Sequence, residues 1–455
     1  MSITDPHPAA LADSDKGQLE QLQQIIDDLL GEARRRGASA AEAVVSNSTG
    51  LEVGVRLGEV ETVEHTRDHG LGVTVYFGHR KGSASTSDLS RAALRDAVAQ
   101  ACTIATHTQE DPCNGLPPAE LMANAIPDLD LSHPWAISVD DAVRLAILCE
   151  DAARADDPRI TNSEGASVST HAGLQVYGNS NGFIGGYPST RHSLSCAVVA
   201  DDGDGMRRDY WWSSARAAED LEEAAAVGRR AAERAVARLG GRSIGTCKVP
   251  ILFQAMLAAG LLRHLAAAIS GDNIYRKTSF LLERLGEQLF PSGFTLSEEP
   301  HKPRGLASAP FDSDGVATRP QAFVEDGVLT GWSLGHYAAC RLGLQSTGNA
   351  GGLRNMRVPL GEHDRDGMLR LLGTGLYVTD LMGQGVNGVT GDYSRGASGF
   401  WVEDGIIQYP VEEITIASNL KDMYANLVAI GNDCDFPGST TTGSWLIEEM
   451  TIAGS

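Results

Sequence analysis

The stretch Leu51-Glu-Val-Gly-Val-Arg-Leu, which continues as Val60-Glu-Thr-Val-Glu-His, decides the fold of the N-terminal half of the chain. Apolar and polar residues alternate in it with a period of two, which predicts strands that are buried on one face. Gly58-Glu59 supplies the turn between the two segments. Gly70-Leu-Gly-Val-Thr-Val-Tyr-Phe reads as a further strand that ends in a turn at Gly78-His79. The region therefore predicts a β-meander.

Helices are predicted on both sides of this meander. In 18–36, Leu19, Leu22, Ile26 and Leu29 recur at steps of three and four residues, and Gly37 ends the pattern. In 90–105 a serine stands at the N-cap position, ahead of regularly spaced alanine and leucine residues. The first unit is thus helix, meander, helix.

The same order of elements recurs later in the chain. We expect, in turn, a helix at 140–156, strands at 173–177, 183–187 and 192–200 with a turn at 178–182, and a long alanine-rich helix at 217–239. This repetition indicates either an internal duplication or two units that pack into one larger lobe. Different strand orders in the two units would contradict a duplication.

The residue pattern of the sequence changes after Gly240-Gly241, which we predict to be a hinge. A strand at 249–253 leads into a helix at 255–270, and glycine-punctuated strands follow. Two Glu-Asp-Gly turns, at 325–327 and 403–405, predict hairpins, because Asp-Gly accepts the positive φ angles of such turns. We predict an α+β protein with a disordered segment at 1–17, α/β units at 18–110 and 111–240, and a β-rich C-terminal domain at 241–455.

Composition excludes several classes of function. The chain has 455 residues and a net charge of −22, so its surface repels nucleic acid. It has neither an apolar run long enough for a membrane span nor a signal peptide, which predicts a cytoplasmic protein. The seven cysteines are odd in number and lack Cys-x-x-Cys spacing. They are expected to be reduced thiols, with no disulfide and no zinc knuckle.

Three motif matches are more simply explained by structure. Gly178-Asn-Ser180-Asn-Gly182 fits the nucleophile-elbow pattern, but a strand follows where a helix is needed, so a hairpin turn is favoured. Gly383-Gln-Gly-Val-Asn-Gly388 fits the dinucleotide fingerprint, again without a helix after it. His65 and His69 have the spacing of metal ligands only on a helix, whereas this region predicts strands and a turn.

Asp392 and Arg395 lie in a glycine-rich stretch with Trp401 close behind. Such a pair suits a loop that binds a substrate carboxylate or a peptide backbone. A structural ion pair that fixes the loop explains the residues equally well, and both interpretations stay open.

The helix at 255–270 bears on catalysis. A zinc hydrolase needs two histidines on one helical face and a glutamate that activates water. Here His264 stands alone, with Leu265 and alanines in place of the acid and the second ligand. None of the twelve histidines in the chain is followed by glutamate. We therefore expect no catalytic residue and no metal ligand at this degenerate position.

Several long strings resemble the TldD/PmbA family over nearly the whole chain. They include Arg159-Ile-Thr-Asn-Ser-Glu-Gly, Ser189-Thr-Arg-His-Ser-Leu-Ser, Gly305-Leu-Ala-Ser-Ala-Pro-Phe-Asp-Ser-Asp-Gly-Val and Thr390-Gly-Asp-Tyr-Ser-Arg-Gly-Ala. The resemblance implies a cytosolic metalloprotease of two subunits that removes leader peptides and degrades small unfolded substrates. One subunit, TldD, carries a His-Glu-x-x-x-His helix and a distant cysteine that bind zinc.

The other subunit of that family has the same fold without the zinc ligands. Matched by position, the zinc helix falls on 260–272 here, where the glutamate and the second histidine are missing. Cys434 has no helix ligands to join. The resemblance thus implies zinc in a TldD-like partner and none on this chain.

Three functional hypotheses follow. The first is a non-catalytic subunit that works with a TldD-like partner on leader or unfolded peptides. The second is a homodimeric peptide-binding or regulatory protein without protease activity, and the third is an independent hydrolase that uses Ser180.

Overall fold

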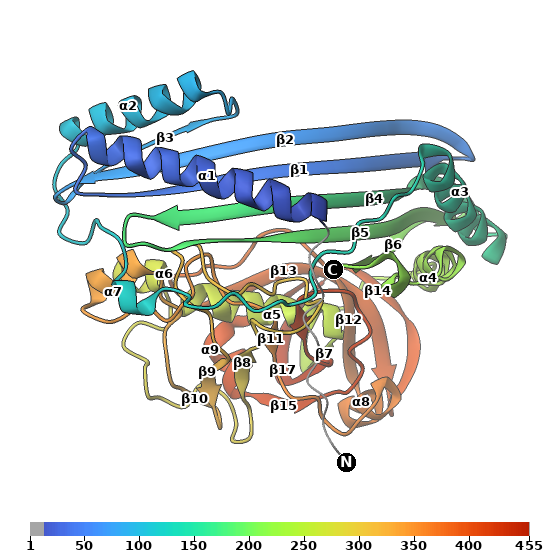
Figure 1. Ribbon diagram of the computed structural model, residues 1–455. Helices are drawn as coiled ribbons and strands as arrows, with labels where there is room; N and C mark the ends of the chain where they lie inside the picture. The colour runs from blue at the N-terminus through green and yellow to red at the C-terminus, as the bar shows by residue number, and fades with distance from the viewer. Residues whose placement is uncertain (1–12, 455) are drawn as a thin grey trace, which may run out of the picture.

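The computed structural model describes residues 13–454, which form two lobes (Figure 1). The N-terminal lobe is built on one six-stranded antiparallel sheet, in the order β3-β2-β1-β4-β5-β6. Its strands are β1 (Ala40–Arg56), β2 (Glu59–Phe77), β3 (Arg80–Thr86), β4 (Ile160–Asn179), β5 (Ile184–Asp201) and β6 (Met206–Ala215). The α+β class expected from the sequence is confirmed.

The two predicted units form the two halves of this sheet. Each contributes a three-stranded meander, and their first strands, β1 and β4, pair antiparallel at the centre, from Glu42 opposite Asn179 to Val55 opposite Ala166. The strand order is the same in both units, so the result that would have contradicted a duplication is not observed. The domain boundaries at 110 and 240 stay predictions, since both units belong to one sheet.

Four helices cover one face of the sheet, two at each end. They are α1 (Asp13–Arg35), α2 (Arg91–His107), α3 (Val139–Asp156) and α4 (Ala224–Ala237). In β1, alternate residues Ala41, Ala43 and Val45 pack under α1 and α2, and Val53 and Val55 pack against the cluster that holds α3 and α4. The period-two pattern therefore places the apolar residues of β1 on the helix-covered face.

Several sequence predictions for this lobe are confirmed. Helix α1 covers the predicted 18–36, Ser90 accepts a hydrogen bond from Ala93 N as the N-cap of α2, and 178–182 is a hairpin turn between β4 and β5. Because α1 begins at Asp13, residues 13–17 are helical and not disordered as expected; the remainder of that predicted segment lies outside the described residues.

Other predictions for this lobe are wrong. The two strands expected between Val60 and Phe77 form the single strand β2, and those expected at 183–187 and 192–200 form the single strand β5. Strands β3 and β6 were not predicted. The helix expected at 217–239 begins only at Ala224, after a short 3₁₀ turn at Ala218–Asp220. Side chains of β6 explain the late start: Ser213 Oγ accepts from Glu222 N at 2.9 Å, and Trp211 Nε1 donates to the Glu222 carboxylate at 3.2 Å.

The C-terminal lobe is a small barrel with added hairpins. Its main sheet has the spatial order β14-β13-β12-β7-β17. Strand β14 also pairs with β17, which closes the sheet into a ring. Their bounds are β7 (Cys247–Phe253), β12 (Gly375–Met382), β13 (Asp392–Glu403), β14 (Ile406–Asn419) and β17 (Trp445–Ala453), and β15 (Leu427–Ile430) extends the sheet. Both predicted Asp-Gly hairpins are confirmed, with positive φ at Asp326-Gly327 and Asp404-Gly405.

A second sheet and five helices complete this lobe. The sheet has the order β10-β9-β8-β11-β16. Its strands are β8 (Leu296–Glu298), β9 (Gln321–Glu325), β10 (Val328–Leu329), β11 (Met356–Arg357) and β16 (Thr440–Thr441). The helices are α5 (Ala255–Ala268), α6 (Gly271–Tyr275), α7 (His336–Leu342), α8 (Arg365–Leu372) and α9 (Leu420–Ala425), and a 3₁₀ turn lies at Ala119–Leu121 in the long connection from α2 to α3.

A disulfide joins this connection to the C-terminal lobe. Cys113 and Cys340 are bonded, and their Cα atoms lie 5.5 Å apart. The expectation of seven reduced thiols is therefore wrong for these two residues, whereas the other five cysteines are free. Residues 227 positions apart in the chain meet only in the folded protein, which is why their spacing gave no signal.

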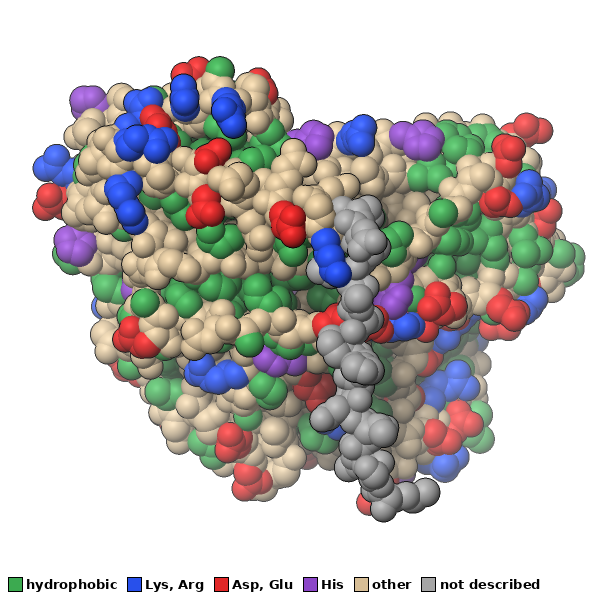
Figure 2. All heavy atoms as spheres, in the orientation of Figure 1, with side chains coloured by type: hydrophobic (Ala, Val, Ile, Leu, Met, Phe, Trp, Pro, Cys, Tyr) green, Lys and Arg blue, Asp and Glu red, His purple; other side chains and the backbone are tan. Residues whose placement is uncertain are grey.

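Two observations concern the surface. No helix among the described residues is long and apolar enough to cross a bilayer. On the face seen in Figure 2, Lys and Arg side chains gather over the end of the N-terminal lobe that carries α2, where Arg35, Arg91 and Arg95 line a shallow depression.

The contact between α3 and α4 provides a test of packing. A Cβ atom on Gly228 would lie 2.0 Å from the carbonyl oxygen of Cys149. We expect Gly228→Ala to lower the free energy of unfolding by about 2 kcal/mol, because the helices must separate. Gly31→Ala in α1 is the control, since only the end of Arg35 lies near, at 3.5 Å. It should stabilise by about 0.5 kcal/mol. Urea unfolding measures both, and equal effects would contradict this account.

The disulfide provides a second test. We expect Cys113→Ser to lower the free energy of unfolding by about 2–4 kcal/mol, because the bond closes a long loop in the unfolded chain. Adding reductant to the wild-type protein should give the same loss in thermal unfolding. Cys102→Ser, at a free and partly exposed thiol, should change little. A count of seven free thiols in denatured, unreduced protein would show that the bond is not formed.

Candidate functional site

Helix α5 occupies the position at which the sequence suggested a degenerate zinc helix. It follows directly after β7, with Gln254 as its N-cap residue. Its inward face consists of apolar side chains that belong to the main core of the C-terminal lobe: Ala258, Leu261, Leu262, Leu265 and Ala268. This face packs like any buried helix, which explains why an alanine- and leucine-rich sequence forms it.

His264 is a packing residue in this environment. Its ring lies edge-on to Tyr393 of β13, with centroids 6.3 Å apart. Burial, followed by the charges of Arg395 and Arg263, lowers the pKa of His264 below its usual value. The imidazole is therefore neutral at pH 7.

The residues around His264 do not fit a zinc ion. Leu265 and Ile269 are fully buried, and both are apolar. Among residues 13–454, no three His, Cys, Asp or Glu side chains come together in a way that could hold a metal. Cys434 lies in the segment after β15, half-buried, and burial raises the pKa of its thiol. The helix and the cysteine thus supply no ligand set.

Asp392 and Arg395 bind different partners and do not pair with each other. The Asp392 carboxylate accepts from Thr390 Oγ1 at 2.6 Å and from Asn419 Nδ2 at 3.1 Å. Arg395 donates from Nε to Met382 O at 3.1 Å. Both residues are held by contacts at the loop between β12 and β13. The structure therefore shows no ion pair between them, and neither side chain is free of protein partners. Their role in substrate binding stays a prediction.

The three motif matches are structural. Ser180 Oγ accepts from Ala41 N at 3.0 Å within a hairpin turn, with no helix after it. The 383–388 segment is followed by strand β13, and Gly385 lies so close to Ser394 O that a Cβ would be 1.9 Å away. His65 and His69 are exposed on strand β2. None has the geometry that its motif requires.

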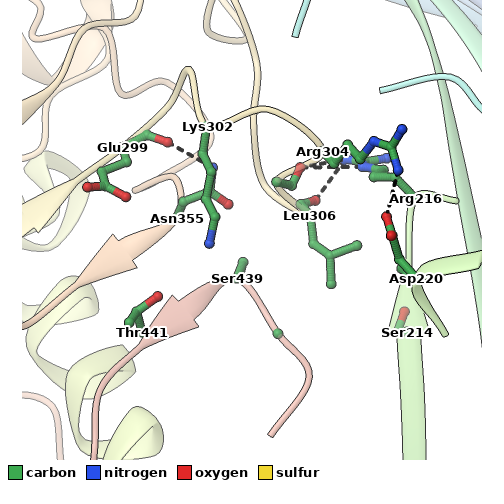
Figure 3. Close-up of a pocket in the computed structure, with 13 residues that line it drawn as sticks. Ser214, Arg216, Asp220, Glu299, Lys302, Arg304, Leu306, Asn355, Ser439 and Thr441 are labelled. Atoms are coloured by element: carbon green, nitrogen blue, oxygen red, sulfur yellow. Dashed lines mark hydrogen bonds and ion pairs between the residues drawn. The ribbon is translucent and has the colours of Figure 1, made fainter. Parts of the chain in front are cut away.

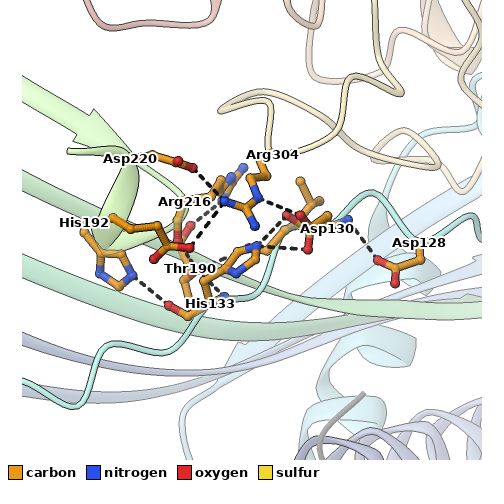
Figure 4. A network of polar contacts seen from close by, with 10 residues as sticks. Asp128, Asp130, His133, Thr190, His192, Arg216, Asp220 and Arg304 are labelled. Atoms are coloured by element: carbon orange, nitrogen blue, oxygen red, sulfur yellow. Dashed lines mark hydrogen bonds and ion pairs between the residues drawn. The ribbon is translucent and has the colours of Figure 1, made fainter. Parts of the chain in front are cut away.

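The strongest polar feature is a network at the junction of the two lobes (Figure 4). Arg304, from the C-terminal lobe, contacts three carboxylates: Asp130 at 2.6 Å, Asp220 at 3.0 Å and Glu219 at 3.4 Å. Arg304 is the largest cause that lowers the pKa of Asp130, followed by the charge of His133. One guanidinium therefore ties the connection after α2 and the turn after β6 to the second lobe.

Arg216 is the second arginine that joins the two lobes. Its guanidinium donates to the carbonyl oxygens of Thr190 at 2.9 Å, Leu306 at 2.9 Å and Gly305 at 3.3 Å. Burial lowers the pKa of Arg216, yet a guanidinium stays charged at pH 7. Sequence reasoning missed both arginines. The only signal was that the string shared with the TldD/PmbA family begins at Gly305, immediately after Arg304.

A cavity of about 470 Å³ lies where the sheet meets the segment 311–314, and Glu42 and Asp312 are among the residues that line it. The Glu42 carboxylate accepts from the hydroxyls of Tyr76 and Tyr177, both at 2.8 Å. Burial raises the pKa of Glu42, and burial together with the charge of Asp314 raises the pKa of Asp312 to about 6. Glu42 is held by two tyrosines of the sheet, and Asp312 accepts hydrogen bonds from backbone N–H groups of its own lobe, so neither carboxylate links the two lobes.

Removing Arg304 tests the junction. Because Arg304 contacts three carboxylates, we expect Arg304→Ala to lower the free energy of unfolding at pH 7, and the partial exposure of these partners keeps the effect small. The folded-state pKa of Asp130 is depressed, so its contribution is present above pH 3.8 and is lost as the pH falls below that value. The difference between wild type and variant should shrink at acid pH and in high salt.

Urea unfolding at several pH values measures this difference. Arg365→Ala is the matched control, because Arg365 contacts only the exposed Asp366 beside it. An Arg304 effect as small as that of the control, or one that does not change with pH, would speak against the network.

The sequence is similar to known proteins over most of its length. Models of the PmbA/TldA metallopeptidase family match domain 1 at residues 41–105, the central domain at 132–239 and the C-terminal domain at 246–454. The metalloprotease PmbA of Escherichia coli O157:H7 is 48% identical over 448 residues, which cover 98% of this chain and 100% of that protein.

Solved structures of similar proteins share the fold of this chain. A crystal structure from Bacteroides thetaiotaomicron has a TM-score of 0.91 and 26% identity, covering 96% of this chain and 99% of that one. TldE from Thermococcus kodakarensis shares the fold, with a TM-score of 0.81 at 20% identity over 94% of this chain and 100% of that one.

Proposed function

The chain belongs to the PmbA/TldD metallopeptidase family, and we propose that it is a non-catalytic, TldE/PmbA-like subunit of a two-subunit zinc metalloprotease. In this proposal a TldD-like partner carries the zinc and the water-activating carboxylate. The assembly works in the cytoplasm, where it removes leader peptides and degrades small unfolded substrates.

The observation that carries the proposal is the composition of α5. A hydrolytic zinc site needs three protein ligands and a base close to the bound water. Helix α5 offers one neutral imidazole, His264, packed on Tyr393, and buried Leu265 and Ile269 beside it. To install a carboxylate at Leu265 would place a charge in the apolar core, at a cost of several kcal/mol. The helix supports packing, and catalysis is assigned to the partner.

The rest of the chain supports a role in holding substrate. The six-stranded sheet ends in two edge strands, β3 and β6. Most residues of β3 are at least partly exposed. An edge strand offers unpaired backbone N–H and C=O groups to an extended peptide, which suits unfolded chains and excludes folded ones.

The test combines metal analysis with peptide cleavage. The purified chain, a TldD-like homologue and their mixture are each assayed for bound zinc and for cleavage of a leader peptide. We expect zinc in the homologue but not in this chain, and cleavage by the mixture at least about tenfold faster than by either protein alone.

His264→Leu in the mixture serves as the matched variant. It keeps an apolar group against Tyr393, so cleavage should be unchanged. One tightly bound zinc per protomer, with cleavage by this chain alone, would overturn the proposal. Self-association with peptide binding, but no complex with the homologue, would instead favour the homodimeric regulatory protein.

A further inference from the structure

A separate cavity of about 240 Å³ lies at the junction of the lobes, next to the arginine network (Figure 3). The end of β6 and the turn after it form one wall, the segment after β8 forms a second, and the residues around β16 form a third. The side chains that matter here are Arg216, Asp220, Glu299, Lys302, Ser439 and Thr441.

The acidic side chains of this cavity already have basic partners. Asp220 shares Arg304 with Asp130 and Glu219, and Glu299 pairs with Arg357 at 3.0 Å. Among the described residues, no carboxylate lies within ion-pair distance of the two other basic groups of the cavity.

Two positive charges are left without a counter-ion. Arg216 donates only to backbone carbonyl oxygens, which satisfy its N–H groups but do not cancel its charge. The amine of Lys302 has no hydrogen-bond acceptor or carboxylate partner among the described residues. In Figure 3 the Lys302 side chain extends into the space between its own segment and the one that carries Ser439. The cavity thus holds two basic side chains that have no carboxylate partner among the described residues.

Hydroxyl groups complete the lining. Ser439 and Thr441 face the same space, and neither hydroxyl has a protein partner among the described residues. An ammonium, a guanidinium and hydroxyl donors together are the groups that proteins use for carboxylate and phosphate oxygens. The volume is below the roughly 300–1,000 Å³ of pockets for drug-sized ligands, so it fits one terminal group.

The cavity walls are held rigidly, as a binding site requires. Asn355 Nδ2 donates to Glu299 O at 2.8 Å and to Ser308 Oγ at 2.7 Å, while its Oδ1 accepts from Ala307 N at 3.0 Å. Ser308 Oγ in turn donates to Lys302 O at 2.6 Å. The backbone of Lys302 is therefore fixed before any ligand arrives, which reduces the entropy lost on binding.

We propose that this cavity binds an oxyanion, either a carboxylate or a phosphate group, through Lys302 and the charge of Arg216. Two sources share that chemistry: the C-terminal carboxylate of a short peptide, and free phosphate. The proposal concerns this chain alone and does not rest on its role in a protease.

Isothermal titration of the full chain, without any partner, tests the site. The probes are inorganic phosphate, acetyl-trialanine with a free carboxylate, and the same peptide as its amide. We expect saturable one-to-one binding of phosphate or of the free peptide, and no binding of the amide. Lys302→Met should weaken that binding roughly tenfold or more, because it removes a charge-assisted hydrogen bond. Higher salt should weaken it as well.

Lys16→Met is the matched control, since this lysine is exposed on α1 in the N-terminal lobe. It should bind as the wild type does. Because the Lys302 side chain is exposed, Lys302→Met should fold, and an unchanged thermal unfolding curve checks that it does. Binding of the free peptide but not of phosphate identifies a peptide terminus, and the reverse identifies phosphate. No saturable binding of either anion, equal binding of the amide, or unchanged binding by Lys302→Met would each overturn the proposal.

Discussion

The pairing of β1 with β4 is the contact on which the rest of the structure depends. It joins two three-stranded meanders into one sheet, with a continuous register from Glu42 to Val55 along β1. Each meander with its two helices would otherwise leave one edge of its first strand unpaired, exposing a row of backbone donors and acceptors. Because the sheet is continuous, one face is covered by two helix pairs and the lobe can meet the barrel as one body.

The junction of the lobes combines an aromatic cluster with a polar region. Phe183 and Tyr187 of the sheet lobe pack edge-on against Phe311 of the second lobe. Beside that cluster the two lobes meet through carboxylates, guanidinium groups and backbone carbonyls. Such groups are stable at an interface only when each has a partner. Arg304 and Arg216 supply those partners for several chain segments at once. The cavity beside them is lined by Lys302 and Arg216, which have no carboxylate partner among the described residues.

The same logic explains the state of α5. Helix α5 is held by its apolar face, and Leu265 and Ile269 belong to the main core of the C-terminal lobe. Zinc chemistry at this position would require buried polar groups in their place. At this position the sequence supplies side chains for packing and no set of zinc ligands.

Local patterns determined the elements that local physics controls. The sequence by itself determined helix α1, the N-cap at Ser90, both Asp-Gly hairpins and the apolar nature of α5, because periodicity, capping and positive φ depend on a few neighbouring residues. The absence of a second histidine and a glutamate on α5 is likewise visible in the sequence, and the expectation of no zinc there rests on it.

Tertiary structure alone decided the late start of α4, the Cys113–Cys340 bond and the partners of Arg304. Each brings together side chains whose relation no repeat or spacing encodes: Arg304 and Asp130 are 174 positions apart in the chain. Contacts of this kind depend on how whole elements pack, which is a property of the folded molecule.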